Sequence, residues 1–202
     1  LLKDILRGQL RRLNRYSFAG AENEFSAANI ERAMDDLDEP LTDGLVRTSE
    51  KIYDVLMLGK SYPETVGEGK TLSFNLKYID WEHPENNLFH VTDEFAVDSR
   101  DKLHNARPDL VLFINGIPFA VIECKAPQIS VDQAVEQNIR NQQSEYIPQL
   151  YKLAQIVMAT NKNAVKYATT ATPKKFWNVW KEQDTAFLEE ALALYIPDRV
   201  PT

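Results

Sequence analysis

The sequence contains little cysteine or histidine, with one Cys and three His in 202 residues. The single cysteine, Cys124, excludes an internal disulfide and is typical of a reducing compartment, so we expect a cytoplasmic protein. No second cysteine or histidine cluster lies near Cys124, and the histidines lack metal-ligand spacing, which argues against a zinc site. No run of about 18 apolar residues is present, and charges interrupt the leucines of residues 1–10. We therefore expect neither a membrane span nor a secretory signal.

The sequence also lacks excess positive charge. Its formal net charge is −7 and its pI is near 5.1. A protein that binds DNA tightly by itself is usually basic, so we expect any DNA contact to be local or shared with a partner. The phosphate-binding loop G-x-x-x-x-G-K-[S/T] is absent, and we do not expect this chain to bind ATP.

The N-terminal part of the sequence reads as helical. Residues 1–16 have an amphipathic pattern with one basic face, which either contacts phosphates or a neighbouring domain or is simply solvated. A second helix is expected over residues 21–39, ended by Pro40, with its apolar positions inward: Phe25, Ile30, Ala33, Met34 and Leu37. A short helix follows near residues 50–58, and then a glycine-containing loop to residue 70.

Strands dominate the next part of the chain. Residues 71–81 and 87–97 are strand candidates, residues 106–127 form a hairpin, and residues 154–160 and 163–169 form another strand pair. Between them, Ser130 and Gln133 have the spacing of a capping box and predict the start of a helix. A Leu/Ala-rich helix is expected from about Phe187 to Leu194, and Trp177 and Trp180 are expected in the core or on a docking surface. The order predicts an α/β fold with a mixed central sheet flanked by helices.

The expected hairpin, "ARPDLVLFINGIPFAVIECKAP", is apolar on both faces and yet carries three charged residues, Asp109, Glu123 and Lys125. Strands that are covered on both sides have this composition, so we place the hairpin in the middle of the sheet. Burying an unpaired charge is strongly unfavourable, and these side chains therefore need partners, a metal or a function.

The spacing of the three charges sets a geometric condition. Glu123 and Lys125 are two residues apart and share a strand face. A plain two-residue turn at Asn115-Gly116 would pair residues whose numbers sum to an odd value, which puts Asp109 on the opposite face. A three-residue loop or a β-bulge would place Asp109 beside Glu123, and we predict one of these two.

Two neighbouring carboxylates and a lysine have definite chemical uses. The carboxylates repel each other unless a divalent cation lies between them, and oxygen ligands favour Mg²⁺, with Mn²⁺ as the alternative. Lys125 would then orient or deprotonate a water beside the cation and balance developing charge. This is the chemistry of phosphodiester hydrolysis. The competing interpretation is a structural ion pair at the end of the sheet.

These residues resemble a known motif. "RPD" followed by "ECK" resembles the PD-(D/E)xK nuclease motif, and the wider string resembles the N-terminal nuclease domain of the R subunit of type I restriction–modification enzymes. The resemblance extends from about Glu22 to about Thr170. It implies a restriction-endonuclease-like core in which Asp109 and Glu123 hold Mg²⁺, the carbonyl of Cys124 is a further ligand, and Lys125 serves the attacking water.

The helix after the hairpin carries a related signal. Its expected inward stripe begins apolar and ends in Gln142 and Tyr146, which resembles the QxxxY motif of RecB-like and type I nucleases. The stripe consists of Val131, Val135, Ile139, Gln142 and Tyr146. The resemblance implies that Gln142 and Tyr146 contact DNA or a catalytic side chain. Ordinary helix packing is the alternative, and Gln143 is a competing register. Glu24, or equally Glu22, matches an upstream acidic residue of some such nucleases, although a solvated role is the simpler one.

The resemblance implies a type I site-specific deoxyribonuclease activity, the Mg²⁺-dependent endonucleolytic cleavage of double-stranded DNA in defence against foreign DNA. We expect residues 1–20 to form a basic helical segment, residues 21–175 the endonuclease domain, and residues 176–202 a helical segment leading to a downstream ATP-driven translocase. The implied partners are modification and specificity subunits. The alternatives are a stand-alone repair or defence nuclease and a non-catalytic DNA-binding or assembly module.

Overall fold

The computed structural model describes residues 1–98 and 106–181, and the expected helix at residues 187–194 lies outside them. The helices are α1 (Lys3–Leu13), α2 (Ala27–Asp36), α3 (Leu45–Leu58), α4 (Val131–Asn141) and α5 (Pro148–Tyr151). The strands are β1 (Arg15–Phe18), β2 (Ala21–Glu24), β3 (Lys60–Val66), β4 (Lys70–Leu76), β5 (Phe89–Asp93), β6 (Leu110–Ile114), β7 (Ile117–Lys125), β8 (Ile156–Asn161), β9 (Ala164–Ala168) and β10 (Asn178–Val179). Short 3₁₀ turns cover Leu41–Asp43, Gly67–Gly69, Pro84–Asn86 and Lys174–Phe176.

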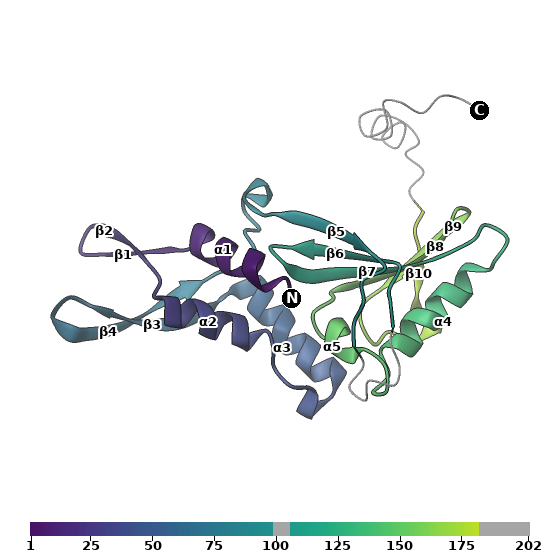
Figure 1. Cartoon of the computed structure of the whole chain (residues 1–202), viewed down its shortest axis with the longest axis horizontal. Coiled ribbons are helices and arrows are strands. Elements are labelled where there is room, and N and C mark those ends of the chain that lie inside the picture. Colours follow the sequence, from purple (N-terminus) through teal and green to yellow (C-terminus); the bar gives the residue numbers. More distant parts are fainter. Residues whose placement is uncertain (99–105, 182–202) are drawn as a thin grey trace, which may run out of the picture.

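A six-stranded mixed sheet occupies one half of the molecule, and the two small hairpins lie in the other half (Figure 1). Its strand order is β10-β9-β8-β7-β6-β5, and all neighbours are antiparallel except β7 and β8, which are parallel. The chain crosses between these two parallel strands through α4, as a parallel pair requires. The expected α/β architecture with a mixed central sheet flanked by helices is confirmed.

The β6–β7 hairpin folds as its turn residues dictate. Asn115 and Gly116 have φ angles of 54° and 83°, the left-handed conformation that a two-residue type I′ turn requires at both positions. The turn packs against α1, where the Leu2 N–H donates to the Gly116 carbonyl at 2.8 Å. Asn115 is fully buried, and its side-chain amide donates to the carbonyl of Tyr78 at 2.9 Å. The hairpin is thereby fixed at both its turn and its paired strands.

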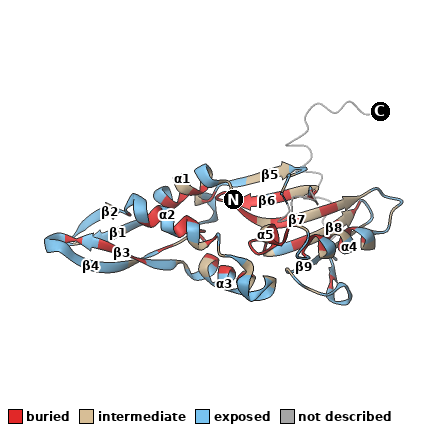
Figure 2. Cartoon of the chain, turned by 60° about the horizontal axis from the view of Figure 1, so that its bottom comes forward, coloured by how far each residue is buried: buried red, intermediate tan, exposed pale blue. Residues whose placement is uncertain are grey.

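Two smaller hairpins, β1–β2 and β3–β4, extend away from the large sheet (Figure 1) and are mostly exposed (Figure 2). Both correct the sequence interpretation. Residues 21–24 are a strand and not the start of a helix, because Gly20 (φ 80°) lets them fold back on β1. Helix α2 begins only after Ser26, whose hydroxyl accepts from the Asn29 N–H. Residues 60–66 are a strand and not a loop, because in a two-stranded hairpin Pro63 interrupts pairing on the open edge only.

Buried apolar residues form two clusters. One joins α1, α2 and α3 to the base of the β3–β4 hairpin, and it contains all five residues expected to face inward, namely Phe25, Ile30, Ala33, Met34 and Leu37. Trp177 is buried in the second cluster, under the large sheet, whereas Trp180 is about half exposed. Helix α3 begins at Leu45, five residues earlier than the sequence pattern indicated. Within the residues that the structure describes, no helix is long and apolar enough to cross a membrane.

The two faces of the large sheet differ. Helices α4 and α5 pack on one face, over fully buried side chains such as Val111, Val121 and Val157. On the other face the described part of the chain packs against the turn end of the hairpin, at Ile114 and Phe119, whereas Leu112 and Ile156 remain more than one-third exposed. The hairpin is internal to the sheet, as expected, but the expectation that both of its faces are covered is wrong for the described residues.

Candidate active site at the end of strand β7

A β-bulge brings the acidic residues together. The turn pairs Ile114 with Ile117, and the register then shifts between Leu112 and Phe113, so that Leu110 pairs with Ile122. One position further along, this register sets Asp109 opposite Glu123. The predicted bulge is confirmed. The Asp109 carboxylate accepts from the Cys124 N–H at 2.7 Å. The carbonyl of Asp109 also accepts from the Glu94 N–H at 3.0 Å, which ties the residue to the chain that follows β5.

Glu123 is fully buried beside Asp109. The pKa of the Glu123 carboxyl is raised to about 8, mainly by burial and then by the neighbouring Asp109, while Lys125 and Arg140 act in the opposite direction. A buried acid next to another acid favours its neutral form because the charged form loses water and meets a like charge. In the absence of a cation, the pair therefore retains a proton near neutral pH.

Two amides of α4 hold Glu123. The Gln137 side-chain amide donates to one carboxyl oxygen at 2.5 Å, and the Asn141 amide donates to the other at 3.0 Å. The oxygen of the Gln137 amide accepts from the Lys125 ammonium at 2.5 Å. A single glutamine thus connects the acid and the lysine, and it fixes the distance between the groups that would hold a cation and serve a water.

Helix α4 places these amides because of its position over the sheet. Ser130 caps the helix by accepting from the Asp132 N–H, which confirms the predicted start. The buried side of the helix consists of Val131, Ala134, Val135, Asn138 and Asn141. Gln137 and Asn141 are four residues apart and so lie one above the other on the helix surface. They were not among the predicted site residues, although their spacing of four on the inward side of the helix is visible in the sequence.

The predicted helical stripe does not continue to Tyr146. Helix α4 ends at Asn141, and Gln142 is its C-cap residue. The Gln142 side-chain oxygen accepts from the Ala171 N–H at 2.6 Å, so this side chain secures the loop after β9. The Tyr146 ring lies 5.3 Å from the guanidinium carbon of Arg140. Contact of Gln142 and Tyr146 with DNA stays a prediction, but the glutamine that reaches the acidic pair is Gln137.

The upstream acids do not join the site. Glu22 and Glu24 lie on β2, in a hairpin at the opposite end of the molecule from α4 (Figure 1), and not on a helix as expected. Glu24 forms an ion pair with Arg15 at 2.8 Å, and Glu22 accepts from the Ser17 hydroxyl. Both belong to the β1–β2 hairpin.

Cys124 lies between the two charged residues of β7 and is half-buried. Burial raises the pKa of its thiol, and the Asp109 and Glu123 carboxylates raise it further. A thiol in this environment is a weak nucleophile and a poor metal ligand. The role expected for Cys124, as a metal ligand through its backbone carbonyl, does not involve the thiol and stays a prediction.

The donor set fits a hard cation. Among the described residues, no group of three or more His, Cys, Asp or Glu side chains could hold a metal. Asp109 and Glu123 supply two carboxylates, and Mg²⁺ is commonly bound by one or two carboxylates with water and phosphate oxygens completing the shell. Beside them, the side-chain oxygen of Asn141 is buried without a hydrogen-bond partner. A cation would also relieve the repulsion that raises the Glu123 pKa.

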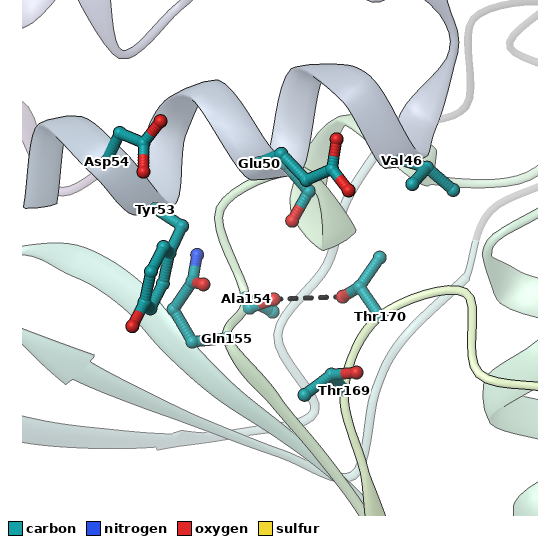
Figure 3. A pocket seen from close by; sticks show the side chains of 9 residues that line it. Val46, Glu50, Tyr53, Asp54, Ala154, Gln155, Thr169 and Thr170 are labelled. Atoms are coloured by element: carbon teal, nitrogen blue, oxygen red, sulfur yellow. Dashed lines mark hydrogen bonds between the residues drawn. The ribbon is translucent and has the colours of Figure 1, made fainter. Parts of the chain in front are cut away.

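Of two surface hollows, one lies next to the pair Asp109 and Glu123 and the other lies elsewhere. The open hollow beside the pair is lined by Lys125, Gln133, Glu136, Gln137 and Arg140, and Gln137 is the lining residue that bonds to Glu123. Another lies between α3, which carries Glu50 and Asp54, and the segments next to β8 and β9, which carry Thr169 and Thr170 (Figure 3). There the Thr170 hydroxyl donates to the Ala154 carbonyl at 2.9 Å. None of the predicted site residues lines this second hollow.

The sequence matches a family model described as "Type I restriction enzyme R protein N terminus" over residues 1–176. The chain belongs to this family. The domain is 33% identical over 138 residues to the MjaIXP type I restriction enzyme endonuclease subunit of Methanocaldococcus jannaschii, covering 63% of the chain and 13% of that relative. It is 29% identical over 196 residues to the MjaVIIIP endonuclease subunit of the same organism, covering 91% of the chain and 18% of that relative.

A third relative comes from another organism. The chain is 22% identical over 176 residues to the HindI type I restriction enzyme endonuclease subunit of Haemophilus influenzae, covering 81% of the chain and 16% of that relative. The chain therefore spans less than one-fifth of the length of these curated relatives. The predicted family is confirmed, and the activities of the longer proteins are matters for proposal.

Proposed function

We propose that this domain cleaves double-stranded DNA endonucleolytically, in a reaction that depends on Mg²⁺, as the nuclease module of a type I restriction enzyme R subunit. The observation that supports this most directly is the convergence of Asp109, Glu123 and Lys125 on the α4 side of β7, with Gln137 bonded to both Glu123 and Lys125. An ion pair with a purely structural role would need neither the burial of Glu123 nor the second carboxylate beside it, which together raise the Glu123 pKa to about 8.

Each residue has a distinct task in this proposal. Asp109 and Glu123 would hold the cation, which supplies Lewis-acid activation of the phosphodiester and of water. Gln137 orients the Glu123 carboxylate and keeps Lys125 close to it. Lys125 positions the attacking water and balances negative charge as the phosphorus–oxygen bond breaks. The open hollow beside Lys125 and Arg140 admits the DNA backbone to this point.

We expect the longer protein to contain further activities and to assemble with other subunits. Relatives of which the match covers less than one-fifth are named as endonuclease subunits of type I restriction enzymes. We propose that ATP-driven translocation belongs to the part of the longer protein outside this chain, and that modification and specificity subunits select the DNA. The chain itself contains no phosphate-binding loop motif and should not bind ATP.

Plasmid nicking by the assembled enzyme in Mg²⁺ or Mn²⁺ tests the assignment. We expect Asp109→Ala and Lys125→Ala each to reduce cleavage at least about 100-fold, because removal of one charge-stabilising group at a reaction centre costs that much. The matched control is Lys162→Ala, a change at an exposed lysine between β8 and β9, which should cleave like wild type. Full cleavage by both site variants would contradict the proposal.

A further inference from the structure

The open face of the large sheet is a continuous apolar surface. Six side chains from across the sheet contribute to it, and they are exposed to between 36% and 63% in the described part of the chain: Phe89, Val91, Leu112, Ile156, Tyr167 and Trp180. Together with neighbours from the central strands they line one groove. Contiguous apolar patches of this kind mark interaction surfaces.

The chemistry of the groove restricts what can cover it. No Asp, Glu, Lys or Arg lines it, so it offers no permanently charged side chain to the phosphates of a nucleic acid. The parallel pair β7–β8 lies beneath it, and parallel strands are ordinarily covered on both faces. The occupant is therefore expected to be an apolar helix face.

The chain itself supplies such a face immediately after the groove. Trp180 lines the groove, its N–H donates to the Val165 carbonyl at 2.9 Å, and its ring packs edge-on against Tyr167. Residues 184–196, "DTAFLEEALALYI", follow within a few positions. Their apolar residues recur at helical spacing, whereas the two glutamates fall on the other side. The apolar positions are Phe187, Leu188, Ala191, Leu192, Leu194 and Tyr195.

We propose that residues 184–196 pack as an amphipathic helix on the open face of the sheet. Thirteen helical residues span roughly 20 Å. Strands lie roughly 4.8 Å apart, so this length is enough to cross the three intervals from β9 to β6. Pro197 then ends the helix. The nuclease fold is thereby closed by the segment that directly follows its last strand, and the inference is independent of the proposed catalytic activity.

Cysteine labelling of the 202-residue chain tests the proposal in a Cys124→Ser background. Leu112→Cys places a thiol in the groove, and Leu72→Cys places one on β4, far from it; the two leucines are exposed to 36% and 44%. If the groove were open, both thiols would react with a maleimide at similar rates. We expect the Leu112→Cys thiol to react at least tenfold more slowly, and the double substitution Leu188→Asp and Leu192→Asp to remove the difference.

Matched controls and alternative outcomes decide the result. Glu189→Lys, on the opposite side of the helix, should leave the labelling rates unchanged, and circular dichroism confirms that each variant is folded. Equal rates at the two thiols in the parent chain would overturn the proposal. The proposal would also be overturned if the Leu112→Cys thiol reacted slowly and the Leu188→Asp and Leu192→Asp changes did not raise its rate. If such labelling depends on protein concentration and sedimentation shows a dimer, a second copy covers the groove instead.

Discussion

At the scale of single residues, Glu123 should make stability depend on pH. Its pKa is raised from 4.5 to about 8, so the folded protein binds this proton more tightly than the unfolded chain does. The stabilisation is fully present below about pH 4.5 and is lost as the pH rises to about 8. In Glu123→Gln this contribution is absent. Denaturant unfolding in EDTA should therefore show wild type losing up to about 1.4 kcal/mol more per pH unit across this window than the variant.

The control for this measurement is Glu145→Gln, a change at an exposed residue just after α4, which should follow the pH profile of wild type. The contrary result is that the free energies of unfolding of wild type and Glu123→Gln change in parallel between pH 5 and pH 8, with the gap between them changing by less than about 0.5 kcal/mol. The buried acidic pair would then not retain a proton near neutral pH. Such a result would also remove the main electrostatic reason for a cation between Asp109 and Glu123.

At the scale of secondary-structure elements, the type I′ turn determines whether the hairpin can dock on α1. A Cβ on Gly116 would lie 2.7 Å from the Leu2 carbonyl oxygen, and the residue has a φ of 83°. Gly116→Ala should therefore lower the free energy of unfolding by roughly 1–3 kcal/mol. Gly8→Ala is the matched control, because Gly8 is helical and nothing lies near its Cβ position. It should stabilise the protein by roughly 0.5–1 kcal/mol. Equal thermal midpoints for the two variants would contradict this account.

The same hairpin shows how far the sequence predicts the site. The local sequence predicts the turn residues of the hairpin and its internal place in the sheet. It also predicts the bulge, because side chains alternate between the strand faces and Asp109 and Glu123 are an even number of residues apart. Gln137 and Asn141 were missed because the end of α4 carries no glycine or proline before Pro148, so the apolar spacing could be continued to Tyr146. The β1–β2 hairpin was missed because its strands have only four residues each: the alternation in β1 is too short to identify a strand, and β2 has no large apolar residue.

At the scale of the whole molecule, charge limits what the chain can do alone. The net charge is −7, and two cations of the basic segment at the N-terminus are already paired with acids. Arg7 bonds to Glu31 and Asp4, and Arg15 pairs with Glu24. Basic residues that are neutralised within the protein contribute little to phosphate binding, which depends on the release of counterions from DNA. Of the two alternatives for residues 1–16, the structure therefore favours a solvated basic face whose charge is partly neutralised by acids over a face that contacts phosphates.

This charge distribution predicts weak binding of DNA by the isolated chain. Fluorescence anisotropy with a labelled duplex should give a dissociation constant no tighter than roughly 10⁻⁶ M near physiological salt, and binding should weaken steeply as salt rises. Glu31→Gln removes the acid that pairs with Arg7 and should strengthen binding by severalfold if the N-terminal basic face contacts phosphates. Glu50→Gln, on α3, is the control for the change in net charge alone. Tight binding that resists salt would show a DNA-binding surface that neither the net charge nor the paired arginines explain, and DNA capture would then not depend on other subunits.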